Sequence, residues 1–293
     1  MKRAMQLGAV ICGTVLVIGT LAGCGTKQAA AAKQSAAAKP GPPRAGKVAM
    51  TGTAMAAGGP EKPNPKPTNA TEALQQAQRA HKHLVVLAYA KDDDKTKQMK
   101  AVFAKAQKSL AKQAILYQLR VGDQKESGFV REYQLAGAPL PLTLVFAPNR
   151  AIVNAYVQKV VDERQLADSL ASPKLAEVLK LLQERKLVLV CIQGSGTKHN
   201  AESMKAARDV VADEKANGAI QYVRVDPRDE GSADLLRQLN VEGGVREAAL
   251  AILVPPGTVA ATVPGATTKN ALWDAIVRSV QSCGAGCGPS GCG

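Results

Sequence analysis

Aromatic residues and cysteines are scarce in this sequence, and long apolar runs are confined to one end. Phe, Trp and Tyr make up 3% of the 293 residues, and there are six cysteines. Six cysteines in a chain of this length exclude a disulfide-dense secreted scaffold. The single long apolar run, near the N-terminus, excludes a protein with many membrane spans. The length predicts one large or two small domains.

The formal net charge of +14 is unevenly distributed along the chain. Residues 1–23 carry +2 and residues 25–68 carry +6, so more than half of the excess precedes the predicted domains. A basic extended segment beside a membrane is attracted to anionic headgroups by about 1 kcal/mol per charge. No basic stripe is interleaved with aromatic residues, so we expect no nucleic-acid partner.

An export signal is predicted at residues 1–23. Lys2 and Arg3 precede an apolar stretch, Leu7–Leu21, which is short for a spanning helix but suits a signal-peptide core. The stretch ends in Leu21-Ala22-Gly23-Cys24, which resembles the lipobox of bacterial lipoproteins. The resemblance implies cleavage before Cys24, a diacylglyceryl thioether on its sulfur, and N-acylation by a fatty acid such as palmitate. The alternative is an ordinary cleaved signal in which Cys24 is coincidental.

The lipobox resemblance also implies a location. Membrane lipid would be a partner through Cys24, and the protein would lie in the cell envelope, at the periplasmic face of an outer membrane or at the cell surface. Residues 24–68, rich in Ala, Lys and Pro, cannot bury enough apolar surface to offset the entropy of ordering. We therefore expect a disordered tether between the anchor and the folded part.

Residues 69–282 contain one pattern twice. Three strand-like runs recur in the same order: Leu84–Tyr89 with Leu187–Ile192, Ala114–Tyr117 with Ala219–Tyr222, and Leu142–Phe146 with Leu250–Val254. Amphipathic helices are predicted at Thr71–His81, Phe129–Leu135, Pro173–Glu184, Ala233–Leu239 and Lys269–Val280. The repeat predicts two related α/β domains, at 69–172 and 173–282, each with a mixed central sheet and helices on both faces.

The order of elements, together with one local segment, resembles the thioredoxin fold. The segment Tyr133–Phe146 looks like the part of that family that leads from the third helix through a cis-proline into the next strand. Pro141 is the preferred cis-proline and Pro139 is the other candidate. The resemblance implies that Pro141 adjoins a site for extended peptides. The resemblance is weaker in the second domain, where Arg246–Ala249 contains no proline.

The dithiol that this family uses for redox chemistry is missing. The corresponding stretches, Lys91–Thr96 and Gly194–His199, contain no cysteine. Cys191 lies within an apolar strand and is expected to be a buried, inert thiol. Asp92-Asp93-Asp94 does not follow the spacing of a calcium loop, and we expect favourable charge at a helix N-terminus instead.

Three of the remaining cysteines, Cys283, Cys287 and Cys292, lie in a glycine-rich tail, residues 283–293. Flexible thiols of this kind suit a soft metal ion, Cu or Zn, although the spacing matches no standard zinc motif. They also suit a disulfide with one free thiol, or a mobile dithiol that carries electrons. Incidental cysteines in a disordered end are the fourth interpretation.

Three functions follow from these features. The preferred hypothesis is a lipoprotein that acts as a binding or scaffold protein, with an envelope protein as its partner, no required cofactor and no assigned catalytic residue. The second is a thiol–disulfide oxidoreductase or electron carrier that uses Cys283, Cys287 and Cys292. The third is a metal-handling protein in which these cysteines are the ligands.

Overall fold

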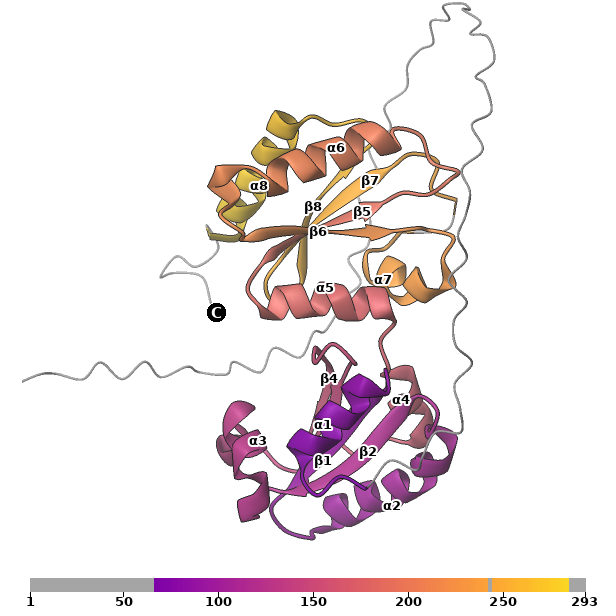
Figure 1. Cartoon of the computed structure of the whole chain (residues 1–293), viewed down its shortest axis with the longest axis vertical. Helices are drawn as coiled ribbons and strands as arrows, with labels where there is room; N and C mark the ends of the chain where they lie inside the picture. Colours follow the sequence, from indigo (N-terminus) through magenta and orange to yellow (C-terminus); the bar gives the residue numbers. More distant parts are fainter. Residues whose placement is uncertain (1–65, 242–243, 285–293) are drawn as a thin grey trace, which may run out of the picture. The chain divides into compact units, whose positions relative to one another are not determined.

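A computed structural model of the chain describes residues 66–241 and 244–284, which form two sheets of four strands each (Figure 1). The strand orders are β2-β1-β3-β4 and β6-β5-β7-β8. In each sheet the first two strands in sequence are parallel, and the third and fourth join them antiparallel. This order of elements defines two tandem thioredoxin-like α/β domains. Within the described ranges, no helix is both long enough and apolar enough to cross a membrane.

The first domain follows the predicted order of strand, helix, strand, helix and two strands, after an initial helix. Its elements are α1 (Ala70–Arg79), β1 (His83–Tyr89), α2 (Asp94–Ser109), β2 (Ala114–Arg120), α3 (Ser127–Glu132), β3 (Leu142–Phe146), β4 (Ile152–Val157) and α4 (Glu163–Asp168). Helices α1 and α3 share a core with one face of the sheet, whereas α2 and α4 cover the other face. Strand β1 is buried on both faces, which explains its unbroken apolar run.

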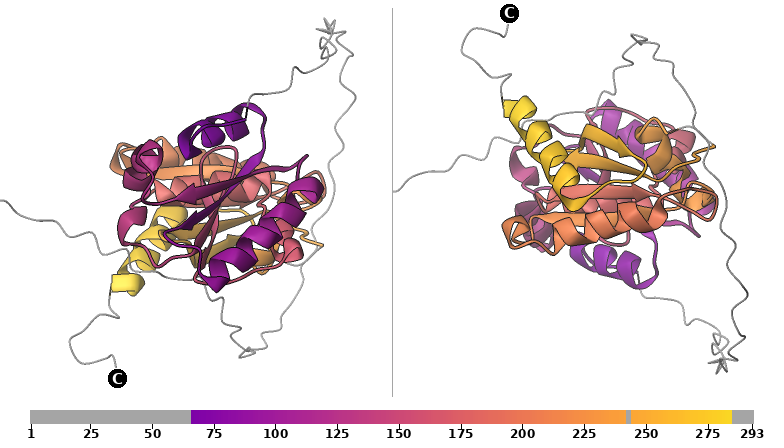
Figure 2. Two further views of the ribbon diagram at one scale, coloured as in Figure 1. Left: turned by 90° about the horizontal axis from the view of Figure 1, so that it is seen from below. Right: turned by 90° about the horizontal axis from the view of Figure 1, so that it is seen from above.

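The second domain repeats the arrangement. Its elements are α5 (Pro173–Gln183), β5 (Leu187–Ile192), α6 (Asn200–Val211), β6 (Ile220–Val225), α7 (Ala233–Gln238), β7 (Ala249–Val254), β8 (Thr258–Pro264) and α8 (Lys269–Gly284). Helices α5 and α7 cover one face of this sheet, and α6 and α8 cover the other (Figures 1 and 2). Helix α8 continues to Gly284 rather than ending at Val280 as expected.

The predicted helix starts depend on side-chain caps that the structure contains. Asn69 accepts a hydrogen bond from the Glu72 N–H, and Ser172 accepts one from the Leu175 N–H with Pro173 in the first turn of α5. Glu72 itself accepts from Thr68 rather than from the capping residue, so a reciprocal capping box does not form at α1. Caps therefore set where α1 and α5 begin.

The sequence alignment of the two domains differs from the structure by one residue in each of the three matched strands. Leu84 and Val188 occupy the same core position, beside the first helix of their domains, and so do Ile115 and Gln221, and Leu142 and Ala249. The alignment by residue type paired Leu84 with Leu187 instead. Neighbouring residues on a strand point to opposite faces, so that alignment exchanges the two faces of the sheet.

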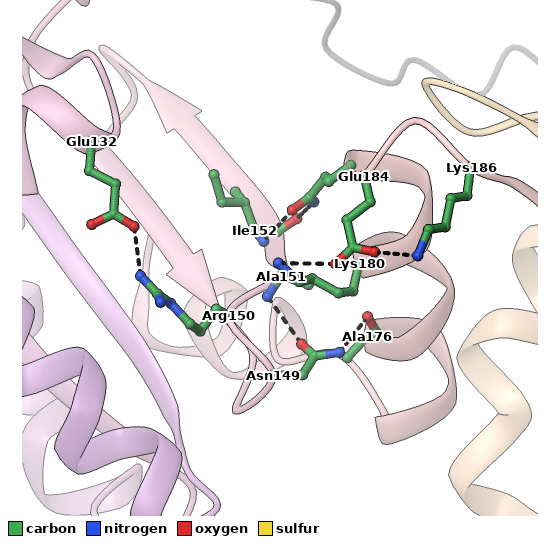
Figure 3. A network of polar contacts seen from close by, with 10 residues as sticks. Glu132, Asn149, Arg150, Ala151, Ile152, Ala176, Lys180, Glu184 and Lys186 are labelled. Carbon is green, nitrogen blue, oxygen red and sulfur yellow. Dashed lines mark hydrogen bonds and ion pairs between the residues drawn. The ribbon is translucent and has the colours of Figure 1, made fainter. Parts of the chain in front are cut away.

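Helix α5 also contacts the turn between β3 and β4 (Figure 3). The Gln183 side chain accepts a hydrogen bond from the Ile152 N–H at 3.1 Å and donates one to its carbonyl at 2.6 Å. Asn149 donates to the Ala176 carbonyl at 2.8 Å and accepts from the Ala151 N–H at 3.1 Å. These bonds satisfy backbone groups at the start of β4, an edge strand of the first sheet.

Asp213 lies just beyond the end of α6, and its contacts predict that the stability of the second domain falls at acidic pH. Lys269 lies 2.7 Å from its carboxylate, and the Lys215 N–H donates to it. These contacts, led by the hydrogen bond from Lys269, lower the pKa of Asp213 from 3.8 to about 2. A carboxyl whose pKa is lower in the folded state stabilises the fold above its unfolded pKa, and this stabilisation is lost as the pH falls from about 4 to about 2.

Asp213→Asn is therefore expected to reduce stability at neutral pH and to flatten the fall in the free energy of unfolding between about pH 4 and pH 2. The indole of Trp273 donates to Asp213 at 3.3 Å, so Trp273 fluorescence during urea unfolding is the measurement. An unchanged pH slope in Asp213→Asn would show that this carboxylate is not responsible.

Candidate binding groove

A groove in the first domain lies where the N-terminus of α2 meets the turn before β3. It has a volume of about 340 Å³ and is lined by Asp93, Asp94, Lys95, Leu140, Pro141 and Gln158. The Leu140–Pro141 peptide bond is cis, at the preferred position, whereas Pro139 has no cis bond. The structure thus places the predicted proline, Pro141, in a surface groove.

The acidic run at this groove caps a helix, as the sequence predicted. Asp93 is the N-cap of α2 and accepts a hydrogen bond from the Thr96 N–H at 2.8 Å. This bond lowers the pKa of Asp93, with a smaller contribution from the nearby Lys91 and Lys95. Asp92 instead pairs with Lys100. The three carboxylates therefore do not converge on one point.

Two backbone groups beside Pro141, one N–H and one carbonyl, are not used by hydrogen bonds within the described structure. Among the residues that the structure describes, no hydrogen bond is made by the Leu140 N–H or by the Pro139 carbonyl. The Pro141 carbonyl accepts from the Gln158 N–H, and Lys95 donates to the Gln158 carbonyl at 3.2 Å. An extended segment entering the groove can therefore bond to backbone atoms without any required side-chain sequence.

The equivalent position in the second domain is occupied by the chain itself. Sheet register makes Ala248 the counterpart of Pro141. The Lys198 N–H donates to the Arg246 carbonyl at 2.9 Å, and the Ala248 N–H donates to the Lys198 carbonyl at 2.8 Å. Lys198 thus forms an isolated parallel bridge with Glu247.

Loop length and glycine explain how Lys198 reaches this position. The loop before α6 runs from Gln193 to the N-cap His199, whereas the loop before α2 runs only from Ala90 to Asp93. The two glycines of the longer loop leave room for neighbouring side chains, because a Cβ on Gly194 would lie 2.5 Å from the Asp226 carboxylate and one on Gly196 would lie 2.3 Å from the Arg228 guanidinium. The sequence pattern alone did not predict this bridge.

Neither candidate redox position carries a thiol, and Cys191 is 1% exposed within β5. Burial raises the pKa of Cys191 to about 12, so at neutral pH its sulfur is not a thiolate. We expect no alkylation of Cys191 by iodoacetamide at neutral pH in the folded chain, and one adduct after unfolding, measured by peptide mass with the tail cysteines replaced by serine. Rapid labelling of folded protein would contradict this burial.

The other predicted site residues cannot be placed in a site. Cys24, Cys287 and Cys292 lie outside the described residues, and Cys283 belongs to the last turn of α8. In residues 66–241 and 244–284, no three His, Cys, Asp or Glu side chains gather in a way that could hold a metal ion. Lipidation at Cys24, a Cu or Zn site in the tail and an oxidoreductase role for the tail therefore stay predictions.

Comparisons with known proteins return solved structures only. No family model matches the chain, and no curated protein matches it. The first two thioredoxin domains of Eps1p from Saccharomyces cerevisiae are 12% identical, with 73% of this chain and 98% of that chain covered and a TM-score of 0.27. Human ERp44 is 13% identical over 72% of this chain and 56% of that chain, with a TM-score of 0.31. The thioredoxin Deadhead from Drosophila melanogaster is 17% identical over 33% of this chain and 88% of that chain, with a TM-score of 0.27.

The class of protein that the fold of this chain defines is a tandem thioredoxin-like protein. Its strand order, its parallel and antiparallel pairings and its helices on both faces of each sheet carry that assignment. The two segments at which the fold family carries its dithiol contain no cysteine in this chain.

Proposed function

We propose that this chain is a lipid-anchored protein of a bacterial cell envelope that binds extended segments of partner proteins. Binding takes place at the groove beside Pro141 in the first domain and involves no thiol exchange. The anchor is the diacylglyceryl group on Cys24, and residues 24–68 are the tether that gives the domains reach from the membrane. The lipobox residues and the basic tether support this part of the proposal.

The observation that carries the binding proposal is the contrast between the two domains. The first leaves the Leu140 N–H and the Pro139 carbonyl without partners in the described structure, beside a groove of about 340 Å³. The second pairs the Arg246 carbonyl, the counterpart of the Pro139 carbonyl, with the Lys198 N–H. It also pairs the Ala248 N–H with the Lys198 carbonyl, at the position where the first domain has Pro141 and therefore no N–H. Backbone groups that are not bonded within the chain can pair with an added extended segment, as at an unpaired strand.

The absence of sulfur at both helix N-termini makes binding, rather than disulfide exchange, the chemistry of the groove. The thiolate is the nucleophile in that exchange, and α2 begins with Asp93 and Asp94 instead. A carboxylate cannot form a mixed disulfide. The partner is held by non-covalent contacts only.

The test uses an unfolded polypeptide, reduced and carboxymethylated α-lactalbumin, immobilised on a biosensor surface. We expect the full chain to bind it, and Lys95→Glu and Leu140→Asp each to weaken binding about tenfold, which corresponds to about 1.4 kcal/mol. Lys95 is exposed, so its replacement does not disturb the core. The matched control is Glu247→Asp, the counterpart of the Leu140 change, with unchanged affinity expected.

Three outcomes would count against the proposal. Equal affinity of the wild type, Lys95→Glu and Leu140→Asp would place binding elsewhere. Reduction of insulin disulfides by the wild type that is lost when Cys283, Cys287 and Cys292 are changed to serine would move the function to the oxidoreductase alternative. Copper or zinc retained through dialysis and lost in the same triple variant would favour the metal alternative.

A further inference from the structure

A second groove lies in the second domain, at the end of the sheet where β5 and β6 begin and β7 ends. Its volume is about 420 Å³, and sites that bind small ligands have volumes of about 300–1,000 Å³. Apolar side chains from two strands, the turn after β7 and helix α8 line most of it, and they include Leu187, Ile220, Val254, Pro255, Trp273 and Val280. The groove shares no residue with the one beside Pro141.

Helix α8 exposes apolar side chains at this groove. Val280 is 52% exposed, and Val277, one turn earlier, is 46% exposed. Residues three and four apart on a helix lie on the same face, so Trp273, Val277 and Val280 form one apolar strip along the margin of the groove. Apolar surface that is continuous in this way is typical of a binding site.

The corresponding end of the first sheet is different. In the register of the two sheets, His83 is the counterpart of Leu187 and Ala114 is the counterpart of Ile220. The Nε2 atom of His83 lies 3.1 Å from the carbonyl oxygen of Ala171, in the segment that follows α4. A polar contact within the chain therefore occupies the position at which the second domain presents the apolar side chain of Leu187.

Two basic side chains at the groove have no acidic partner in the described structure. The neighbouring Lys186 pairs with Glu184 at 2.9 Å. Arg185 and Lys215 both line the groove, and within residues 66–241 and 244–284 neither side chain forms an ion pair or a hydrogen bond. An uncharged ligand that covered these groups would remove water from unpaired charges, so the groove favours a ligand with an anionic group.

The polar groups that line the groove are largely bonded within the chain. The N–H groups of Leu187 and Ala216 donate to backbone carbonyls, and Pro255 has no N–H. The indole N–H of Trp273 donates to Asp213 at 3.3 Å. The backbone of a bound peptide would lose water here without gaining partners, whereas a hydrocarbon chain has no groups that need them.

We infer that this groove binds a single acyl chain that ends in an anionic group, with a long-chain fatty acid as its simplest form. The acyl chain lies against Leu187, Ile220 and Trp273, and the carboxylate pairs with Arg185 and Lys215. An arginine can bond to a carboxylate through two parallel N–H groups, which fixes the orientation of the head group. The inference does not depend on polypeptide binding beside Pro141.

The test uses Trp273, the one tryptophan of the chain, as the reporter. The full chain carries Cys24→Ser, so that no acyl chain at that residue competes for the groove. It is titrated with a dodecanoic acid brominated at its terminal carbon, below the concentration at which micelles form. Because bromine quenches indole fluorescence on contact, we expect saturable quenching of Trp273. The corresponding brominated alcohol, which has no charge, is expected to bind about tenfold more weakly.

Three variants change the groove without disturbing the core, because each position is exposed. Arg185→Glu and Lys215→Glu are each expected to weaken binding of the acid about tenfold, and so is Val280→Asp, which places a carboxylate beside the acyl chain. The matched control is Arg224→Glu, the same change of charge at an exposed position of β6. Arg224 lies four residues beyond Ile220, about 13 Å along the strand, and unchanged affinity is expected.

Three results would overturn the inference. The first is the absence of saturable quenching in the wild type. The second is equal affinity for the acid and the alcohol together with unchanged affinity in Arg185→Glu and Lys215→Glu, which would show that these cations do not select the ligand. The third is binding to phosphatidylglycerol vesicles that is lost in Val280→Asp, without quenching by the free acid, which would assign this surface to a bilayer instead.

Discussion

Phe146→Ala is expected to lower the free energy of unfolding of the first domain by about 3–5 kcal/mol. Phe146 is fully buried at the end of β3. Its ring meets Tyr133 at 5.0 Å and Phe129 at 5.8 Å between centroids, both edge-on. Alanine removes the ring from a core in which α3 packs against the sheet, and the relaxed structure cannot refill that volume.

The measurement is urea unfolding followed by hydrogen exchange, with β1 amides reporting on the first domain. The one tryptophan, Trp273, is in α8 and reports on the second domain. Leu253 is the counterpart of Phe146 in the second domain, so Leu253→Ala should instead lower the urea midpoint that Trp273 fluorescence reports. If Phe146→Ala leaves the exchange of β1 amides unchanged, the aromatic cluster does not stabilise the first domain as described.

Glu126→Ala is expected to destabilise the first domain by about 2–3 kcal/mol. Glu126 is 1% exposed, yet it has a carboxylate side chain. One oxygen accepts from the Ala70 N–H at 2.9 Å, at the first residue of α1, and the other accepts from the Tyr117 hydroxyl at 2.7 Å. Burial, and then the hydrogen bond to Glu126, raise the pKa of Tyr117. Alanine would leave the buried Ala70 N–H without its acceptor, and would leave the Tyr117 hydroxyl only the longer bond to the Thr68 carbonyl, at 3.3 Å.

Glu126→Gln separates hydrogen bonding from charge, since the amide keeps one acceptor oxygen. Its cost should be smaller than that of Glu126→Ala, and Tyr117→Phe should cost about 1 kcal/mol. Chemical denaturation of the three variants, with exchange of the α1 amides, checks this order. Equal stability of Glu126→Ala and the wild type would show that α1 is not held by this carboxylate.

The fold was predictable because local signals agree with it. Apolar runs such as those of β1 and β5, the cap at Asn69 and the Ser172-Pro173 start mark the elements and their order. The register was not predictable, because Leu84–Tyr89 and Leu187–Ile192 are apolar at nearly every position. Such strands are buried on both faces and lack the alternation that would fix which residues face which helix.

The candidate site was predictable only in its first domain. Pro141 carried a local signature, and the missing cysteines at Lys91–Thr96 were visible in the sequence. The bridge from Lys198 to Glu247 was not visible, because it depends on the loop after β5 folding back beside the segment that precedes β7. The Gln183 cap on Ile152 was hidden for the same reason, since its partners are far apart in sequence.

The central claim is that the first domain binds extended polypeptide at its open groove while the second does not. The most direct measurement is hydrogen exchange of the full chain with and without reduced, carboxymethylated α-lactalbumin. We predict slower exchange at residues 90–96 and at the Leu140 amide, with residues 194–199 and the Ala248 amide unchanged. Protection confined to the second domain, or no protection in either domain at a saturating concentration, would contradict the account.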